Sequence, residues 1–202
     1  MAGILVPPAG GSNIFGTHFG ALFPIDRRAR PGQICGGSER EFNFPMAEHK
    51  AIIDWKRTSE EFLKGKYSRE HTWTFDGGLV VPASPAPSVV PVPYSNPAHV
   101  DPEEAYVASV SSCHMMTYLH VASKQGFQID SYYDEAVGTM GKNEKGIPWV
   151  AAIMLNPKIA YSGAKLPTPA DEEKLHHLAH EYCFIANSIK TAVTVGGAPA
   201  AH

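Results

Sequence analysis

Two cysteines in well-separated segments are the residues of this chain best suited to chemistry. Cys113 belongs to a polar stripe that recurs at helical spacing within an otherwise apolar segment, together with Ser109, Thr117 and His120. Buried polar groups need partners, because leaving them unpaired costs free energy. Cys183 lies in a second expected helix, and packing of the two helices could bring the thiols together. The pattern therefore indicates thiol chemistry at Cys113, although a buried cysteine can also serve as a small apolar residue.

An arginine on an apolar strand is the second chemical feature. Residues 67–75 alternate in polarity, which places Arg69 on the same side as Tyr67, Trp73 and Phe75. A guanidinium that points inward must be paired, and beside Cys113 it would favour the thiolate over the thiol. The alternative is that Arg69 lies along the sheet edge with its charge in water. Arg57 is the second candidate for an active-site arginine.

The polar stripe lies on the best-marked helix of the sequence. Asp101 is a favourable N-cap, Pro102 suits the first helical position, and Glu104 completes a capping box. The pattern predicts a helix that runs to about Lys124 and is followed by Gly126 as the C-terminal signal. Its apolar positions extend nearly all round, so we expect it to be buried on most sides.

A carboxylate near the start of this helix is expected to hold the arginine. Glu103 and Glu104 are the candidates, although either can instead cap the helix. Glu103 lies ten residues before Cys113, which corresponds to about 15 Å along a straight helix. One helix does not easily bring both groups to one arginine. We therefore expect a two-fold dimer in which Glu103 of one copy approaches Cys113 of the other.

The remaining elements predict a mixture of helices and strands. We expect a strand over 50–56, a hairpin that joins 67–75 to residues after Asp76, and an extended loop over 82–97, which holds six prolines. Two strands near 127–140 and 147–160 are followed by a helix that begins at Thr168 and by a last strand near 190–195.

Composition indicates one domain and excludes several kinds of partner. We expect an extension over residues 1–45, a domain over 46–195 and a tail over 196–202. The net charge of −3 gives no electrostatic basis for binding nucleic acid or an anionic membrane. Polar residues interrupt the longest apolar segment, 105–122, so it reads as a buried helix and not as a membrane span. Three cysteines suit a reducing compartment such as the cytoplasm.

Two segments resemble the OsmC/Ohr family of thiol peroxidases. DPEEAYVASVSSCHMMTYLHVASKQGF is similar to the family signature around its reactive cysteine, and HEYCFIANSIKTAVTV is similar to the segment around its second cysteine, here 70 residues later. The resemblance covers roughly residues 47–195. It implies that Cys113 is the peroxidatic cysteine, that Cys183 is the resolving cysteine, and that Glu103 orients the active-site arginine.

The resemblance also implies the fold, the reaction and the partners. The family fold is α+β, with two central helices packed against antiparallel sheets in an intertwined homodimer. Its members reduce organic hydroperoxides through a sulfenic acid and an intramolecular disulfide, here Cys113–Cys183. They need no metal or other cofactor, and several receive electrons from a thiol reductant that is a lipoylated protein.

A metal site and a non-catalytic protein are the alternatives. His176, His180 and Cys183 share one helix face at i, i+4 and i+7, and residues of these types bind zinc. The third possibility is a dimer that binds hydrophobic ligands without catalysis, in which Cys113 is unreactive.

Overall fold

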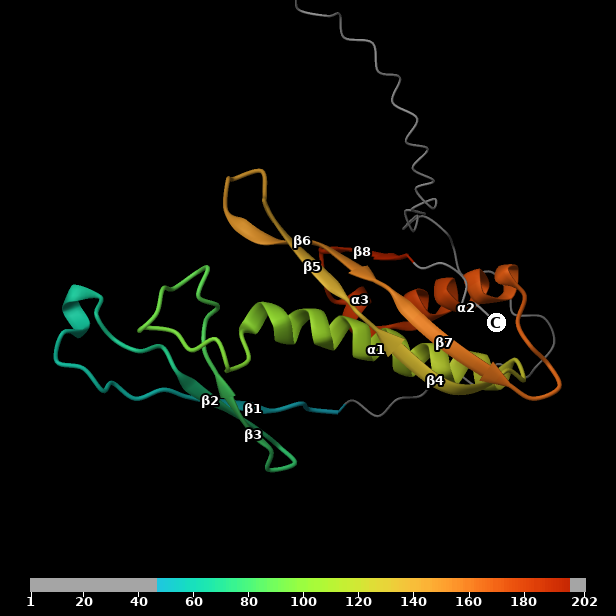
Figure 1. Ribbon diagram of the computed structural model, residues 1–202, viewed down its shortest axis with the longest axis horizontal. Coiled ribbons are helices and arrows are strands. Elements are labelled where there is room, and N and C mark those ends of the chain that lie inside the picture. The colour runs from blue at the N-terminus through green and yellow to red at the C-terminus, as the bar shows by residue number, and fades with distance from the viewer. Residues whose placement is uncertain (1–46, 197–202) are drawn as a thin grey trace, which may run out of the picture.

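The computed structural model describes residues 47–196 and combines helices with mainly antiparallel sheets, which confirms the α+β class (Figure 1). The expected extension over residues 1–45, including Cys35, and residues 197–202 of the expected tail lie outside the described residues. Within the described range no helix is long and apolar enough to cross a membrane.

Helix α1 (Pro102–Lys124) runs through the middle of the molecule, with the ends that its sequence predicts (Figure 1). The Asp101 carboxylate accepts a hydrogen bond from the backbone N–H of Glu104 at 2.7 Å, and the Glu104 carboxylate accepts one from the N–H of Asp101 at 3.4 Å. These bonds satisfy donors that the first turn of a helix leaves free. At the other end Gly126 has a φ of +81°, a left-handed conformation that glycine adopts without steric cost.

A three-stranded antiparallel sheet lies beyond the N-terminal part of α1. It consists of β1 (Ala51–Asp54), β2 (His71–Phe75) and β3 (Val80–Ala83), in that order. A single 3₁₀ turn, Phe62–Lys64, lies in the connection from β1 to β2. The expectation of a strand over 67–75 is wrong in its first half. The backbone N–H of Arg69 donates to the carbonyl of Tyr94, in the proline-rich loop, and β2 begins only at His71.

Two further sheets cover α1 along its middle and C-terminal parts. The first pairs β4 (Gln128–Asp134) with β7 (Pro157–Ser162) in antiparallel orientation. The second has the order β5 (Val137–Lys142), β6 (Pro148–Leu155), β8 (Ala192–Val195), with β8 parallel to β6. The strands expected near 127–140 and 147–160 are thus each divided in two. Asp134, at the division, accepts a hydrogen bond from the N–H of Asn156, so both breaks lie side by side.

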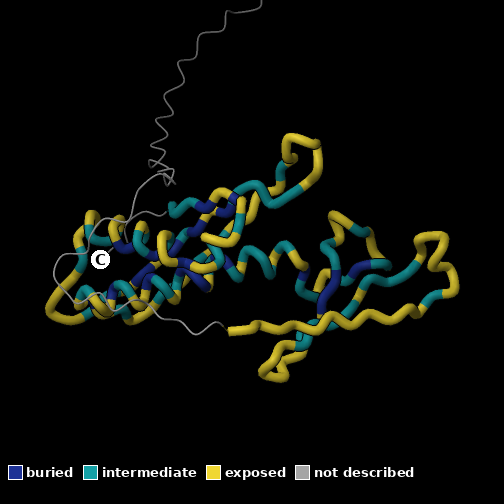
Figure 2. Tube along the Cα trace, turned by 180° about the vertical axis from the view of Figure 1, so that it is seen from behind, coloured by how far each residue is buried: buried dark blue, intermediate teal, exposed yellow. Residues whose placement is uncertain are grey.

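Helix α2 (Pro169–Tyr182) packs on α1, and the short helix α3 (Phe184–Asn187) follows it after one residue. The core forms two clusters that share α1. One joins Tyr118 and Ala122 to Leu175 and Ala179 of α2, and the other joins Val110 to strands β6 and β8. Figure 2 shows the buried residues concentrated in this body, whereas β1 is exposed along its whole length. The face of α1 that carries Cys113 is therefore held against helices of the C-terminal half.

Candidate functional site

The structure brings the side chains of Cys113 and Cys183 together. Cys113 lies in the middle of α1, whereas Cys183 is the single residue between α2 and α3. Both cysteines are free thiols, and the two side chains are joined by a hydrogen bond. Two thiols this close can be oxidised to a disulfide when an oxidant reaches one of them.

The surroundings distinguish the two thiols. Cys183 has no exposed surface, while 9% of Cys113 remains accessible. Burial, together with the hydrogen bond that the Cys183 thiol donates to Cys113, raises the pKa of the Cys183 thiol to about 11. Cys183 is therefore a protonated and weakly nucleophilic thiol at neutral pH, and an oxidant from solvent meets Cys113 first.

The position of Cys183 is fixed by the helices on both sides of it. Its backbone N–H donates to the carbonyl of His180, which closes α2, and its sulfur accepts a hydrogen bond from the N–H of Ala186 at 3.4 Å, which begins α3. Helix α2 itself starts at Thr168 with the capping box that the sequence predicts, completed by Asp171. The sulfur is thus placed by two helix ends and not by a free loop.

A pair of histidines, of which His114 is buried and His176 half-buried, lies between the same two helices. The His114 Nε2 and His176 Nδ1 atoms are 3.1 Å apart, and only 1% of His114 is exposed. Burial, with smaller effects from His176 and His180, lowers the pKa of His114 to about 3, and burial lowers that of His176 to about 4. Both imidazoles are neutral at pH 7, so one donates and the other accepts the proton of their hydrogen bond.

The histidines do not form with Cys183 the zinc site that was the alternative interpretation of the sequence. Within residues 47–196 no group of three or more His, Cys, Asp or Glu side chains is arranged so that it could hold a metal ion. The His176 Nδ1 atom, which helical spacing alone would leave free for a metal, is bonded to His114 instead. The contact could not be predicted from sequence spacing, because 62 residues separate the two histidines.

Within the chain Arg69 is not placed beside the cysteines. Its guanidinium lies 4.1 Å from the centre of the Tyr67 ring and donates to the Tyr67 carbonyl at 3.1 Å. Arg57, the second candidate, donates to the carbonyl of Ser59 and forms an exposed ion pair with Glu60. Both arginines belong to the connection between β1 and β2, which lies at the far end of the molecule from α2 (Figure 1).

The two candidate carboxylates lie in the first turn of α1 and differ in their roles. Glu104 belongs to the capping box with Asp101, so its side chain is engaged within its own helix. Glu103 is half-buried and makes no side-chain hydrogen bond or ion pair with another described residue. Of the two, Glu103 is the carboxylate available to an arginine.

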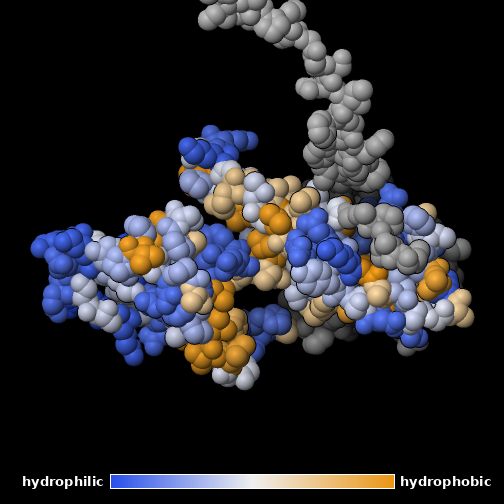
Figure 3. All heavy atoms as spheres, in the orientation of Figure 1, coloured by the Kyte–Doolittle hydropathy of each residue, from blue (hydrophilic) through white to orange (hydrophobic). Residues whose placement is uncertain are grey.

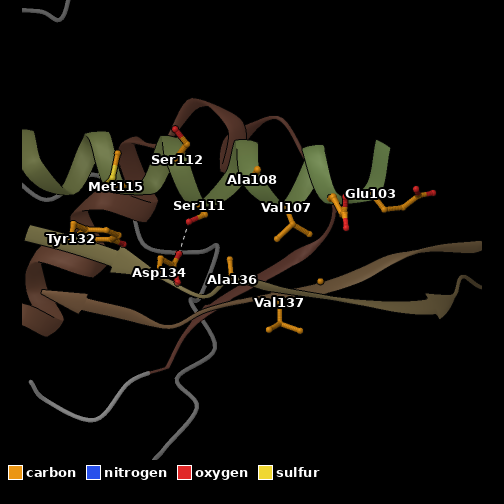
Figure 4. Close-up of a pocket in the computed structure, with 12 residues that line it drawn as sticks. Glu103, Val107, Ala108, Ser111, Ser112, Met115, Tyr132, Asp134, Ala136 and Val137 are labelled. Carbon is orange, nitrogen blue, oxygen red and sulfur yellow. Dashed lines mark hydrogen bonds between the residues drawn. The ribbon is translucent and has the colours of Figure 1, made fainter. Parts of the chain in front are cut away.

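A groove of about 650 Å³ runs between α1 and strands β4 and β5 (Figure 4). Its apolar wall includes Val107, Met115 and Val137, and its polar groups include Glu103, Glu104, Ser111, Asp134 and Tyr132. The Ser111 hydroxyl donates to Asp134 across the groove, as Figure 4 shows. The groove could not be predicted from the sequence, because its walls come from elements that meet only in the folded chain.

The groove and the cysteine pair occupy opposite faces of α1. Ser111 and Met115 line the groove and lie two residues before and after Cys113, a rotation of about 200° on a helix. Cys113 itself does not line the groove and contacts the segment that carries Cys183. A ligand in the groove would therefore be separated from the thiols by the thickness of the helix.

The chain is similar in sequence and structure to proteins of one family. The sequence profile of a family described as OsmC-like protein matches residues 95–196. A solved OsmC-like protein of unknown function from Vibrio cholerae is 53% identical, with a TM-score of 0.73; the match covers 76% of this chain and 100% of that one. No curated protein matches the chain.

More distant solved structures share the fold. An organic hydroperoxide resistance protein from Elizabethkingia anophelis is 17% identical with a TM-score of 0.58, and the match covers 78% of this chain and 99% of that one. The organic hydroperoxide resistance protein of Bacillus subtilis is 20% identical with a TM-score of 0.51, over 76% of this chain and 98% of that one. At these identities the likeness is one of fold.

Proposed function

Because the chain belongs to the OsmC-like protein family, we propose that it is a cysteine-based peroxidase that reduces organic hydroperoxides. The observation that carries the proposal is the contact between Cys113 and Cys183, two thiols that 70 residues separate in the sequence. Two solved proteins with the same fold are named organic hydroperoxide resistance proteins, which supports this class of substrate.

The proposed reaction uses the two thiols in sequence. The Cys113 thiolate attacks one peroxide oxygen, the O–O bond breaks, and the products are a Cys113 sulfenic acid and an alkoxide that takes up a proton. The Cys183 sulfur then attacks the Cys113 sulfur. Hydroxide leaves with the proton of Cys183 as water, and a Cys113–Cys183 disulfide forms. A thiol reductant, for which a lipoylated protein is the candidate, restores both thiols by exchange.

The different environments of the thiols support this order of roles. Cys113 retains accessible surface and can meet the peroxide, whereas Cys183 is fully buried. The raised pKa of Cys183 keeps it protonated, so it does not compete for peroxide in the first step. Cys183 reacts only with the sulfenic acid, because that sulfur forms beside it.

We propose that a second copy of the chain completes the site. Arg69, with Arg57 as the alternative, lies away from Cys113 within the chain, and Glu103 has no partner of its own among the described residues. A two-fold dimer can bring an arginine and Glu103 of one copy to Cys113 of the other. The arginine would favour the thiolate and stabilise the leaving alkoxide.

Exposed apolar residues support the homodimer. On α1, Met116 and Leu119 are exposed, and on the N-terminal sheet Ile52, Ile53, Leu79 and Val80 are exposed. Figure 3 shows apolar side chains gathered at the end of the β2–β3 hairpin. In a monomer the apolar side chains of both the sheet and the central helix would be exposed to water. Exposure of apolar surface in contiguous patches is unfavourable, and a dimer interface would cover it.

The test is turnover of cumene hydroperoxide or t-butyl hydroperoxide, compared with hydrogen peroxide, with dithiol and monothiol reductants. We expect Cys113→Ser to abolish turnover, because a serine hydroxyl is a far weaker nucleophile at neutral pH. One equivalent of organic hydroperoxide should produce a Cys113–Cys183 disulfide in peptide maps, with Cys35 still free. Full turnover by Cys113→Ser would refute the proposal, and an unreactive Cys113 would favour the non-catalytic alternative.

A further inference from the structure

We propose that the reduced Cys113–Cys183 pair binds one soft metal ion that prefers two ligands in a line, with Cu(I) as the representative ion. The inference rests on the contact between the two thiols and on their surroundings. It does not depend on whether the same thiols reduce peroxides.

The number and type of donors select this class of ion. Thiolate sulfur is a soft ligand that favours Cu(I) over hard cations. The part of the chain that the structure describes offers no third His, Cys, Asp or Glu ligand that would complete a metal site. A tetrahedral ion such as Zn²⁺ needs three or four protein donors and is poorly served by two. A pair of sulfur ligands without a third donor therefore suits an ion that is stable with only two ligands.

The neighbouring histidines do not add a third donor. His114 follows Cys113 in the chain, but its Nε2 atom is bonded to Nδ1 of His176. Recruiting either of these bonded nitrogens to a metal would break their hydrogen bond, which is costly, and among residues 47–196 no other ring nitrogen is arranged with the sulfurs as a group of three donors.

Enclosure of the site favours retention of a bound ion. Cys183 is fully buried and 9% of Cys113 is accessible, so an ion reaches the pair through Cys113 alone. Delivery would follow thiolate exchange, in which the carrier's ligand is replaced first by Cys113 and then by Cys183.

Binding requires that both thiols lose their protons. For Cu(I) the balance is two thiols and one Cu⁺ giving one bis-thiolate complex of charge −1 and two released protons. A divalent linear ion such as Hg²⁺ would give a neutral complex with the same release. The apparent affinity should therefore rise with pH, because metal binding to thiols releases protons.

Metal binding and peroxide reduction would exclude each other, because both need the thiolates of Cys113 and Cys183. A disulfide has no thiolate to offer, so the oxidised protein should not bind the ion. A bis-thiolate complex engages the lone pairs that attack peroxide, so the loaded protein should be slow to oxidise. The metal would therefore act as a reversible inhibitor of thiol chemistry at Cys113.

The experiment titrates Cu(I) without oxygen into the reduced full-length chain with Cys35→Ser, against a chromophoric Cu(I) chelator. We expect one Cu(I) per chain, release of two protons, and an X-ray absorption spectrum of two sulfur ligands in a line. Cys113→Ser and Cys183→Ser should each weaken binding at least 100-fold. His177→Asn, which alters an exposed histidine on α2, should leave it unchanged.

Several outcomes would overturn the inference. They are failure of the reduced chain to compete with the chelator, tight binding by Cys183→Ser, or a nitrogen ligand or third ligand in the spectrum. The spectrum is measured on the intact pair, so it decides the matter even if a serine variant does not fold. Cu(I) binding without peroxide turnover would refute only the proposed peroxidase, and turnover without Cu(I) binding would refute only this inference.

Discussion

The Nε2 atom of His114 and the Nδ1 atom of His176 lie 3.1 Å apart at the contact between α1 and α2. These helices also position the two cysteines, so the histidine pair holds together the elements on which the thiol contact depends. The Tyr118 ring lies 4.4 Å from His176, and the Tyr118 hydroxyl is bonded to that of Tyr161 at 2.6 Å. Hydrogen bonds from α1 thus reach α2 through His114 and β7 through Tyr118.

The histidine pair predicts loss of stability in mild acid. The pKa is lowered to about 3 for His114 and about 4 for His176, so between pH 6.5 and these values the unfolded chain binds more protons than the folded one. The free energy of unfolding should therefore fall as the pH falls through this window. Between pH 6.5 and pH 5 the loss is about 2 kcal/mol for each histidine at most.

Denaturant unfolding at a series of pH values measures this effect. His114→Gln should be less stable at pH 7, because a buried hydrogen bond is lost, but its stability should depend less on pH between 6.5 and 5. His177→Gln is the matched control, since His177 is exposed on the same helix as His176. Equal pH dependence in His114→Gln and in the unsubstituted chain would contradict the prediction.

The thiol of Cys183 should titrate far above the ordinary range. In a chain with Cys35→Ser and Cys113→Ser, Cys183 is the remaining thiol. Burial is the largest cause of its raised pKa and persists in this variant, so the ultraviolet absorbance of the thiolate should keep rising beyond pH 9. The same variant in urea should titrate near the ordinary value of ~8.5. A folded-state midpoint near that value would show that the sulfur is hydrated.

Close packing of β5 on α1 predicts that Gly138 tolerates no side chain. A Cβ at this position would lie 2.5 Å from Cγ2 of Val107, and Val107 belongs to the partly buried part of the core. Gly138→Ala should lower the free energy of unfolding by about 1–3 kcal/mol. Gly77→Ala is the matched control, because a Cβ there meets no atom within 4 Å. Combining Gly138→Ala with Val107→Ala should recover part of the loss, and unchanged stability of Gly138→Ala would refute the contact.

The proposed dimer predicts complementation between two inactive variants. Cys113→Ser and Glu103→Ala should each be inactive alone. After joint unfolding and reassembly, mixed dimers would hold one intact site and one doubly altered site, which returns about a quarter of the activity for random pairing. If each site is instead formed within one chain, every site carries one of the two substitutions and no activity returns. Sedimentation of the unsubstituted chain as a monomer would refute the dimer before any mixing.

The helices could be predicted from sequence because their signals are local. The Asp101, Pro102 and Glu104 pattern and the Thr168 to Asp171 pattern each fix a helix start within four residues. The division of the long strands could not be predicted in the same way. It depends on the bond between Asp134 and the N–H of Asn156, and on parallel pairing of β8 with β6.

The candidate site could be predicted only in part. The sequence pointed to Cys113 and Cys183 as thiols that packing could bring together, and their side chains are in contact, while their catalytic roles stay predictions. The expectation that Cys183 lies within the second helix is wrong, because α2 ends at Tyr182 and Cys183 is extended. Arg69 was placed on a strand by alternation, but the strand begins at His71, because the backbone of Arg69 pairs with Tyr94. The partner of His114 is set by the packing of α1 on α2, for which the sequence carries no short-range signal.

The distance in sequence between the two thiols also sets an order of events during synthesis. Cys113 leaves the ribosome 70 residues before Cys183, and at ordinary elongation rates that interval lasts roughly 4–14 s. During this time α2, which covers the cysteine face of α1, does not yet exist, and Cys113 cannot pair with Cys183. If Cys113 is the peroxide-reactive thiol proposed above, nascent chains should be more sensitive than finished molecules to irreversible over-oxidation of Cys113.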